Sequence, residues 1–114
     1  MREERGKLTG DTTIAEPYSL WGTIVGNVTA VKGAKFYVRG SIYGNLVVKS
    51  GGRVHIFGNI SGNLTVLGGK AIHSGIVGGN AVNRGGRLYI ESAARVLGKI
   101  REVDGETTIE PPAP

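Results

Sequence analysis

The sequence repeats with a period of about 18 residues, and this period constrains the fold more than any other feature. Three kinds of residue recur at this step: an asparagine that follows a glycine, an earlier glycine in the same row, and a basic residue. The three columns are Asn27, Asn45, Asn63 and Asn80; Gly22, Gly40, Gly58 and Gly75; and Lys35, Arg53, Lys70 and Arg87. Such columns indicate a protein built from repeated structural units that stack on one another.

Within each row the residues alternate with a period of two. From Ile24 onward the even positions carry mostly aliphatic residues, such as Leu46 and Leu64, whereas odd positions such as Thr65 are mostly polar. Strict alternation predicts strands with one buried face. Short strands that return once in every repeat predict an all-β fold, a single-stranded parallel β-helix of four to five coils. We expect glycines at the corners, where the chain bends and where some residues need a positive φ.

The alternation is confined to the middle of the chain. Residues 18–101 are expected to form the β-helix domain, preceded by a flexible, polar N-terminal tail over 1–17. Residues 102–114 are acidic and rich in proline, which predicts an extended C-terminal tail. The first ten residues show no secretory signal and the chain lacks cysteine, so we expect a cytoplasmic protein.

The asparagine column and the two histidines have structural interpretations. Asparagines at one angular position predict a hydrogen-bonded ladder along the axis. After Gly69 the alternation allows two registers: either Ala71 and His73 point inward, or Ile72 and Ser74 do. The spacing of the basic column favours the first register. His55 is expected on the outer surface, in a column with Tyr37 and Tyr89.

The residues needed for most enzyme chemistry are missing from the body of the repeat. No Asp or Glu occurs between Pro17 and Ile90, which excludes a carboxylate pair or a calcium site there. His55 and His73 lack a third metal ligand, and no serine is spaced with a base and an acid. We therefore expect no catalytic residues, no metal, no cofactor and no small-molecule substrate.

Left-handed β-helix acyltransferases also use coils of this length and were considered as an enzymatic alternative. Their hexapeptides usually place a small or acidic residue after each aliphatic one. This chain has bulky or basic residues there, such as Tyr37 and Lys49. The match is poor, so a non-enzymatic function is favoured.

The rows "GSIYGNLVVKSGGRVHIFG" and "GGRLYIESAARVLGKI" resemble the bactofilins, polymer-forming cytoskeletal proteins of bacteria, over about residues 20–101. The resemblance implies a right-handed coil and nucleotide-independent, end-to-end assembly through apolar terminal rungs. Those rungs would contain Leu20, Trp21 and Ile24 at one end and Val96, Leu97 and Ile100 at the other. The membrane-attaching stretch of the family is not recognisable in "MREERGKLTG", which leaves membrane binding open.

Two functions are therefore expected. The first is a self-assembling scaffold whose partner is another copy of the chain. The alternative is a binding module for a polyanion, a nucleic acid or an anionic glycan, which would contact Lys35, Arg53, Lys70 and Arg87. Residues 22–90 contain eight Lys and Arg and no acid. A solvated basic face that resists edge pairing would explain the same residues without a ligand.

Overall fold

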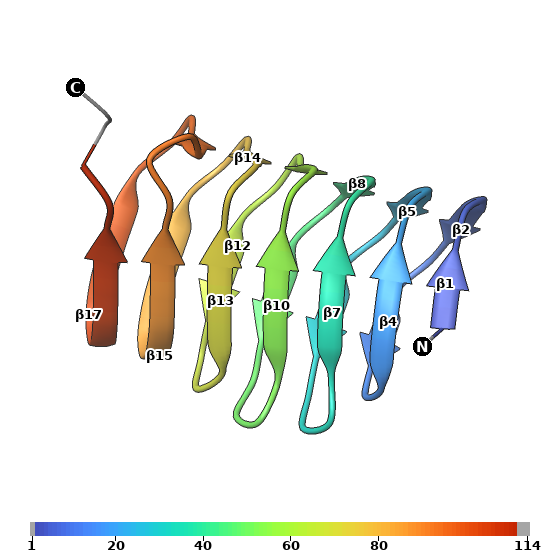
Figure 1. Cartoon of the computed structure of the whole chain (residues 1–114), viewed down its shortest axis with the longest axis horizontal. Helices are drawn as coiled ribbons and strands as arrows, with labels where there is room; N and C mark the ends of the chain where they lie inside the picture. The colour runs from blue at the N-terminus through green and yellow to red at the C-terminus, as the bar shows by residue number, and fades with distance from the viewer. Residues whose placement is uncertain (1, 112–114) are drawn as a thin grey trace.

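Three short strands form each coil of the chain, and every coil pairs in parallel with the next. The computed structural model describes residues 2–111, which contain strands and no helix, and the chain winds through about six coils (Figure 1). The predicted parallel β-helix is confirmed, with one to two more coils than expected. Its longest dimension is 36 Å.

The strands define three sides of the solenoid. The first side contains β1 (Arg2–Glu4), β4 (Pro17–Leu20), β7 (Lys35–Val38), β10 (Arg53–Ile56), β13 (Lys70–His73) and the second halves of β15 (Ala81–Ile90) and β17 (Ile100–Ile109). The second side contains β2 (Lys7–Thr9), β5 (Thr23–Val25), β8 (Ser41–Tyr43), β11 (Asn59–Ile60), β14 (Ile76–Val77) and β16 (Arg95–Val96). The third side contains β3 (Thr12–Ile14), β6 (Val28–Ala30), β9 (Leu46–Val48), β12 (Leu64–Val66) and the first halves of β15 and β17.

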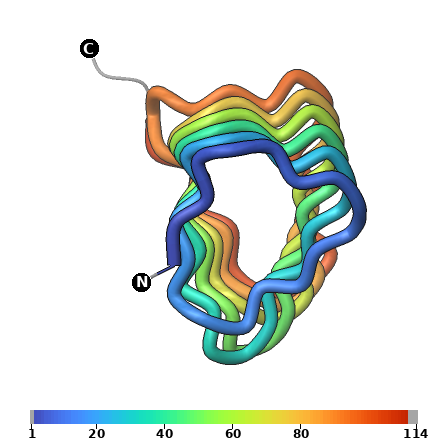
Figure 2. Tube along the Cα trace, turned by 90° about the vertical axis from the view of Figure 1, so that its right-hand side faces the viewer, coloured from blue at the N-terminus to red at the C-terminus, as the bar shows by residue number. Residues whose placement is uncertain are grey.

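The coil is right-handed, as the resemblance implied. Figure 2 looks along the solenoid from its N-terminal end, and the chain runs clockwise as it recedes from the viewer. Figure 1 agrees: the strands of the first side run upward in front, and the chain crosses to the back at the top while the coils progress toward the C-terminus.

The inward side chains form one continuous apolar core along the lumen. Leu64 pairs in register with Leu46 on one side and Ala81 on the other, and all three are fully buried. Phe36 is the largest of the fully buried side chains, and the ring of Tyr18, which is also buried, meets it edge-on with centroids 5.7 Å apart. Burying each large apolar side chain contributes about 1.5–3 kcal/mol to the free energy of unfolding. The apolar columns therefore hold successive coils in register.

Glycine occupies corners where the coils approach most closely. A Cβ on Gly40, between the first and second sides, would overlap the carbonyl oxygen of Gly22 in the coil below. Gly51 has a φ of 82°, in the left-handed region that favours glycine. The glycines expected at the corners thus serve two purposes, close stacking and positive φ.

The asparagine ladder is confirmed at the corner between the second and third sides. The backbone N–H of Asn45 donates to Asn27 Oδ1 at 3.0 Å, and the N–H of Asn63 donates to Asn45 Oδ1 at 2.8 Å. Asn80 continues the pattern on Asn63 at 2.8 Å. Asp11 accepts from Asn27 at the lower end, and Lys99 donates to Asn80 at the upper end.

The N-terminal segment is not a flexible tail, and this part of the domain prediction is wrong. Residues 2–14 form a complete first coil, in which Glu4 pairs with Leu20 and Leu8 pairs with Ile24. Arg2, Glu4 and Thr12 occupy inward positions of this coil. Because the end coil has a neighbour on one side only, these polar side chains reach solvent at the mouth of the lumen. The coil therefore forms by backbone pairing although its apolar alternation is lost.

The C-terminal prediction is also corrected over residues 102–109. Strand β17 runs from Ile100 to Ile109 and pairs with β15, for example through Ile90 and Ile109. Its acidic residues are mostly exposed, so charge does not prevent pairing. Pro112 to Pro114, and Met1 at the other end, lie outside the described residues.

Asn83 is a buried polar side chain at an inward position near the C-terminal end. Its amide lies in the lumen, where Oδ1 accepts from the N–H of Gly86 at 2.9 Å and Nδ2 donates to the carbonyl oxygen of Glu106 at 2.8 Å. These bonds hold a compact corner inside the continuous strand β15. The register prediction after Gly69 is confirmed, because Ala71 and His73 are both fully buried.

Candidate functional site

The four predicted basic residues form one straight column on the outer surface. Lys35 pairs with Arg53, Arg53 with Lys70, and Lys70 with Arg87, and all four side chains are exposed. Pro17 precedes the column and Glu106 follows it, aligned with Arg87. Among residues 2–111 the salt bridges involve Arg2, Arg5 and His55, and none involves the column. Lys35, Arg53 and Lys70 therefore face solvent with no acidic neighbour in the column, whereas Arg87 has Glu106 beside it.

A shallow groove lies on each flank of the basic column. On the first side, the groove is lined by the outward-facing residues Tyr37, His55 and Ile72. On the other flank, at the corner, the groove floor consists mainly of glycines, and the glycines are Gly51, Gly52, Gly68, Gly69, Gly85, Gly86 and Gly105. The column is thus a ridge between a partly aromatic surface and a surface almost free of side chains.

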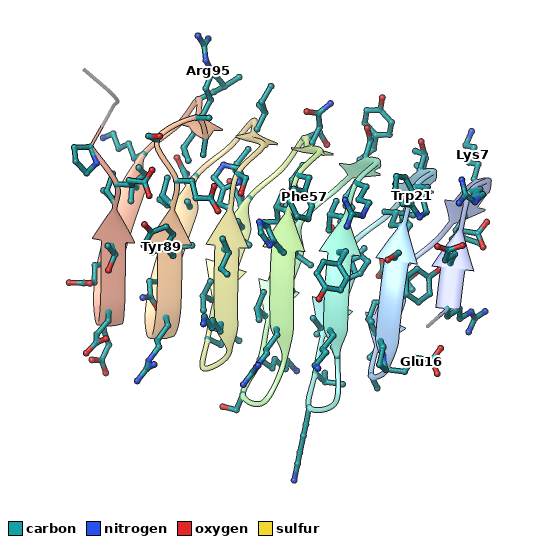
Figure 3. All side chains as sticks on the ribbon, in the orientation of Figure 1. Lys7, Glu16, Trp21, Phe57, Tyr89 and Arg95 are labelled. Carbon is teal, nitrogen blue, oxygen red and sulfur yellow. The ribbon has the colours of Figure 1, made fainter. Side chains whose placement is uncertain are left out.

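A second column, not predicted from the sequence, lies at the corner between the first and second sides. The Arg39 guanidinium carbon lies 4.9 Å from the centroid of the Trp21 ring and 4.7 Å from that of Phe57. Figure 3 shows Trp21 and Phe57 at the upper ends of β4 and β10. Trp21, Arg39 and Phe57 follow one another at the repeat step, so the period could have revealed this cation–π stack.

His55 lies in an outward-facing column, where it pairs with Tyr37 on one side and Ile72 on the other, and Ile72 pairs with Tyr89. Tyr37, His55 and Tyr89 thus share one outer column, as predicted. The His55 ring stacks on Phe57 with centroids 3.8 Å apart. Burial lowers the pKa of His55, the Glu91 carboxylate opposes this effect, and Arg39 adds to it.

His55, Ser74 and Glu91 lie together but do not have the geometry of a catalytic triad. His55 Nε2 lies 3.0 Å from Ser74 Oγ and 3.7 Å from Glu91 Oε1. A triad places the serine and the carboxylate on opposite nitrogens of the imidazole. Here both contact the same nitrogen, so Glu91 is not placed to orient the ring for proton abstraction from Ser74.

The structure places some of the predicted assembly residues at an end of the solenoid and others away from the ends. Leu20 and Ile24 are fully buried in the second coil, beneath the first coil, so their expected position at an end is wrong. Trp21 is exposed, but on a lateral corner. Val96 packs against the core, while Leu97 and Ile100 are exposed in the last coil, where they were expected. The sequence-based assignment failed at the N-terminal end because it did not count the first coil.

The comparisons supply no relative from which a function could be transferred. Neither protein-family models, nor curated proteins, nor solved structures give a match to this chain. The described residues contain no cluster of three or more side chains that could hold a metal ion. They also contain no helix that could span a membrane.

Proposed function

We propose that this chain is a cytoplasmic, bactofilin-like scaffold that assembles end to end through its terminal coils and needs no nucleotide to do so. The supporting observation is that the stack is open at both ends. Within residues 2–111, strands β1, β2 and β3 at one end, and β16 and β17 at the other, have a hydrogen-bonded neighbour on one side only. Such edges present unpaired N–H and C=O groups to another strand.

The C-terminal face, which we define as Leu97, Ile100, Val103 and Ile109, is the stronger candidate for the first contact. These four apolar side chains are 69%, 39%, 58% and 55% exposed, respectively, and all lie in or next to the last strands. Apolar side chains beside an unpaired strand edge favour association with a second copy. Burial of this face and pairing of its edge would occur together.

The N-terminal face is better protected. Arg2 and Glu4 lie at inward positions, where charged side chains oppose further strand addition. Arg2 is held by a 3.6 Å salt bridge to Glu16 and lies over the Tyr18 ring. The proposal therefore assigns the tighter contact to the C-terminal face and a weaker contact to the N-terminal face, so that dimers precede filaments as concentration rises.

Ile100→Arg tests the C-terminal contact. We expect this variant to remain β-rich by circular dichroism and to sediment as a monomer where the wild type forms oligomers. Ile76→Arg is the matched control, because Ile76 is 42% exposed but lies in β14, a second-side strand that has a paired neighbour on both sides and no free edge. Equal assembly of Ile100→Arg and wild type would refute the proposed contact, and loss of assembly in Ile76→Arg would indicate a lateral contact instead.

A further inference from the structure

We propose that the outer surface of the first side binds single-stranded nucleic acid, with the sugar–phosphate backbone along the basic column Lys35, Arg53, Lys70 and Arg87. This binding goes beyond the proposed scaffold function and does not depend on assembly. Four features support it: the unneutralised charge, the insufficiency of a second copy, the line of cations, and the surfaces beside that line.

The central coils carry a charge that nothing in them neutralises. Residues 17–90 contain eight Lys and Arg and no Asp or Glu. Cations stacked in register repel one another, which lowers the free energy of unfolding unless an anion is bound. A ligand that carries several negative charges would relieve this repulsion and bind with a strong dependence on salt.

A second copy of the chain does not supply that ligand. Residues 2–16 contain three basic and four acidic residues, and residues 91–110 contain three basic and five acidic ones. The terminal coils are therefore net −1 and net −2, too little to neutralise the central coils of a neighbour. The whole chain is +5, so lateral contact between copies is repulsive on balance. The complementary anion belongs to another kind of molecule.

The geometry of the column suits a flexible, linear polyanion. Strands of neighbouring coils lie about 4.8 Å apart, so the four cations span about 14 Å in a straight line. A single strand can adjust its phosphates to this line, whereas a duplex holds its phosphates on a rigid cylinder. Glu106 follows Arg87 in the same column and limits the contact to the central coils.

The flanks of the column favour nucleic acid over a sulfated glycan or polyphosphate. The glycine-lined groove lets a sugar–phosphate backbone approach the main chain closely, because no Cβ intervenes. On the opposite flank the bases would lie against Tyr37, His55 and Ile72. Aromatic side chains beside a basic groove are the usual means of sequence-independent binding to single strands. A glycan or polyphosphate carries no flat base to use this surface.

Fluorescence anisotropy with labelled oligothymidylate tests the proposal at several salt concentrations. Arg53→Glu combined with Lys70→Glu should lower affinity by at least about tenfold and reduce the salt dependence. The matched control reverses Lys7 and Arg95, exposed residues on the second side that project at the upper edge of Figure 3. This control makes the same change in net charge and should cause a much smaller loss. The neutral pair Arg53→Gln and Lys70→Gln, with thermal melts of each variant, separates binding from folding.

Tyr37→Ser distinguishes a nucleic acid from a general polyanion. It should weaken oligothymidylate binding while leaving the salt dependence unchanged, because it removes a base contact and no charge. Heparin and polyphosphate, tested at the same salt, should bind more weakly and be insensitive to Tyr37→Ser. The proposal is overturned if oligothymidylate does not bind, if the control reversal matches the column reversal, or if heparin or polyphosphate binds as tightly as the oligonucleotide.

Discussion

His73 is a polar side chain in an apolar lumen, aligned with Ile56 below and Ile90 above. Its Nε2 lies 3.0 Å from the carbonyl oxygen of Arg95 and must carry the proton, because a carbonyl can only accept. Nδ1 is consequently a buried acceptor without a partner. Burial lowers the pKa of His73 below its ordinary value of 6.5, and the bond to Arg95 opposes this shift.

The lowered pKa of His73 predicts a loss of stability in mild acid. The unfolded chain binds the proton near pH 6.5, whereas the folded chain binds it only at lower pH. The free energy of unfolding is therefore unaffected by His73 above pH 6.5 and falls as pH drops below it. Wild type should lose more stability than His73→Leu between about pH 7 and pH 5 in urea melts. His55, whose pKa is also lowered, is present in both proteins and its contribution cancels. Parallel pH profiles would show that His73 does not carry this effect.

Among strands and corners, the features that could be predicted from the sequence are those in which the same type of residue recurs at every repeat. The period, the alternation and the glycine corners all follow from side chains that recur with the same chemistry, as do the asparagine ladder and the basic column. The first coil was missed because Arg2, Glu4 and Thr12 break the apolar pattern. These polar side chains are tolerated at inward positions there because they reach solvent at the end of the stack and are not desolvated. The stack of Trp21 and Arg39 was missed because its members keep the repeat step but differ in type.

The asparagine ladder gives a prediction for the corner between the second and third sides. Asn45→Ala removes two hydrogen bonds. In one, Asn45 Oδ1 accepts from the N–H of Asn63 at 2.8 Å, and in the other Asn45 Nδ2 donates to Asn27 Oδ1 at 3.2 Å. We expect this substitution to lower the free energy of unfolding by about 0.5–1.5 kcal/mol, the net value of a typical hydrogen bond. Asn59→Ala is the control, since Asn59 is an exposed asparagine of β11 outside the ladder. Equal midpoints in urea would show that the ladder adds no stability.

The whole molecule is a short rod with a basic middle, ends that carry all nine acids, and two faces of different character. The apolar C-terminal face and the polar N-terminal face are not equivalent, so the proposed assembly would use the two ends unequally. Rods that meet first through the C-terminal face would form pairs before they form filaments. The basic middle stays accessible in either state, which allows a bound polyanion to lie along the rod without competing for its ends.

Sedimentation velocity of the wild-type chain over a wide range of concentration, with electron microscopy of the same samples, tests the central claim of end-to-end assembly most directly. We predict dimers at low concentration and longer, single-rod-wide polymers at high concentration, with no effect of added nucleotide. Moderate salt should not dissolve them, because the proposed contact is apolar. A chain that remains a monomer at the highest concentration, in both low and moderate salt, would contradict the account.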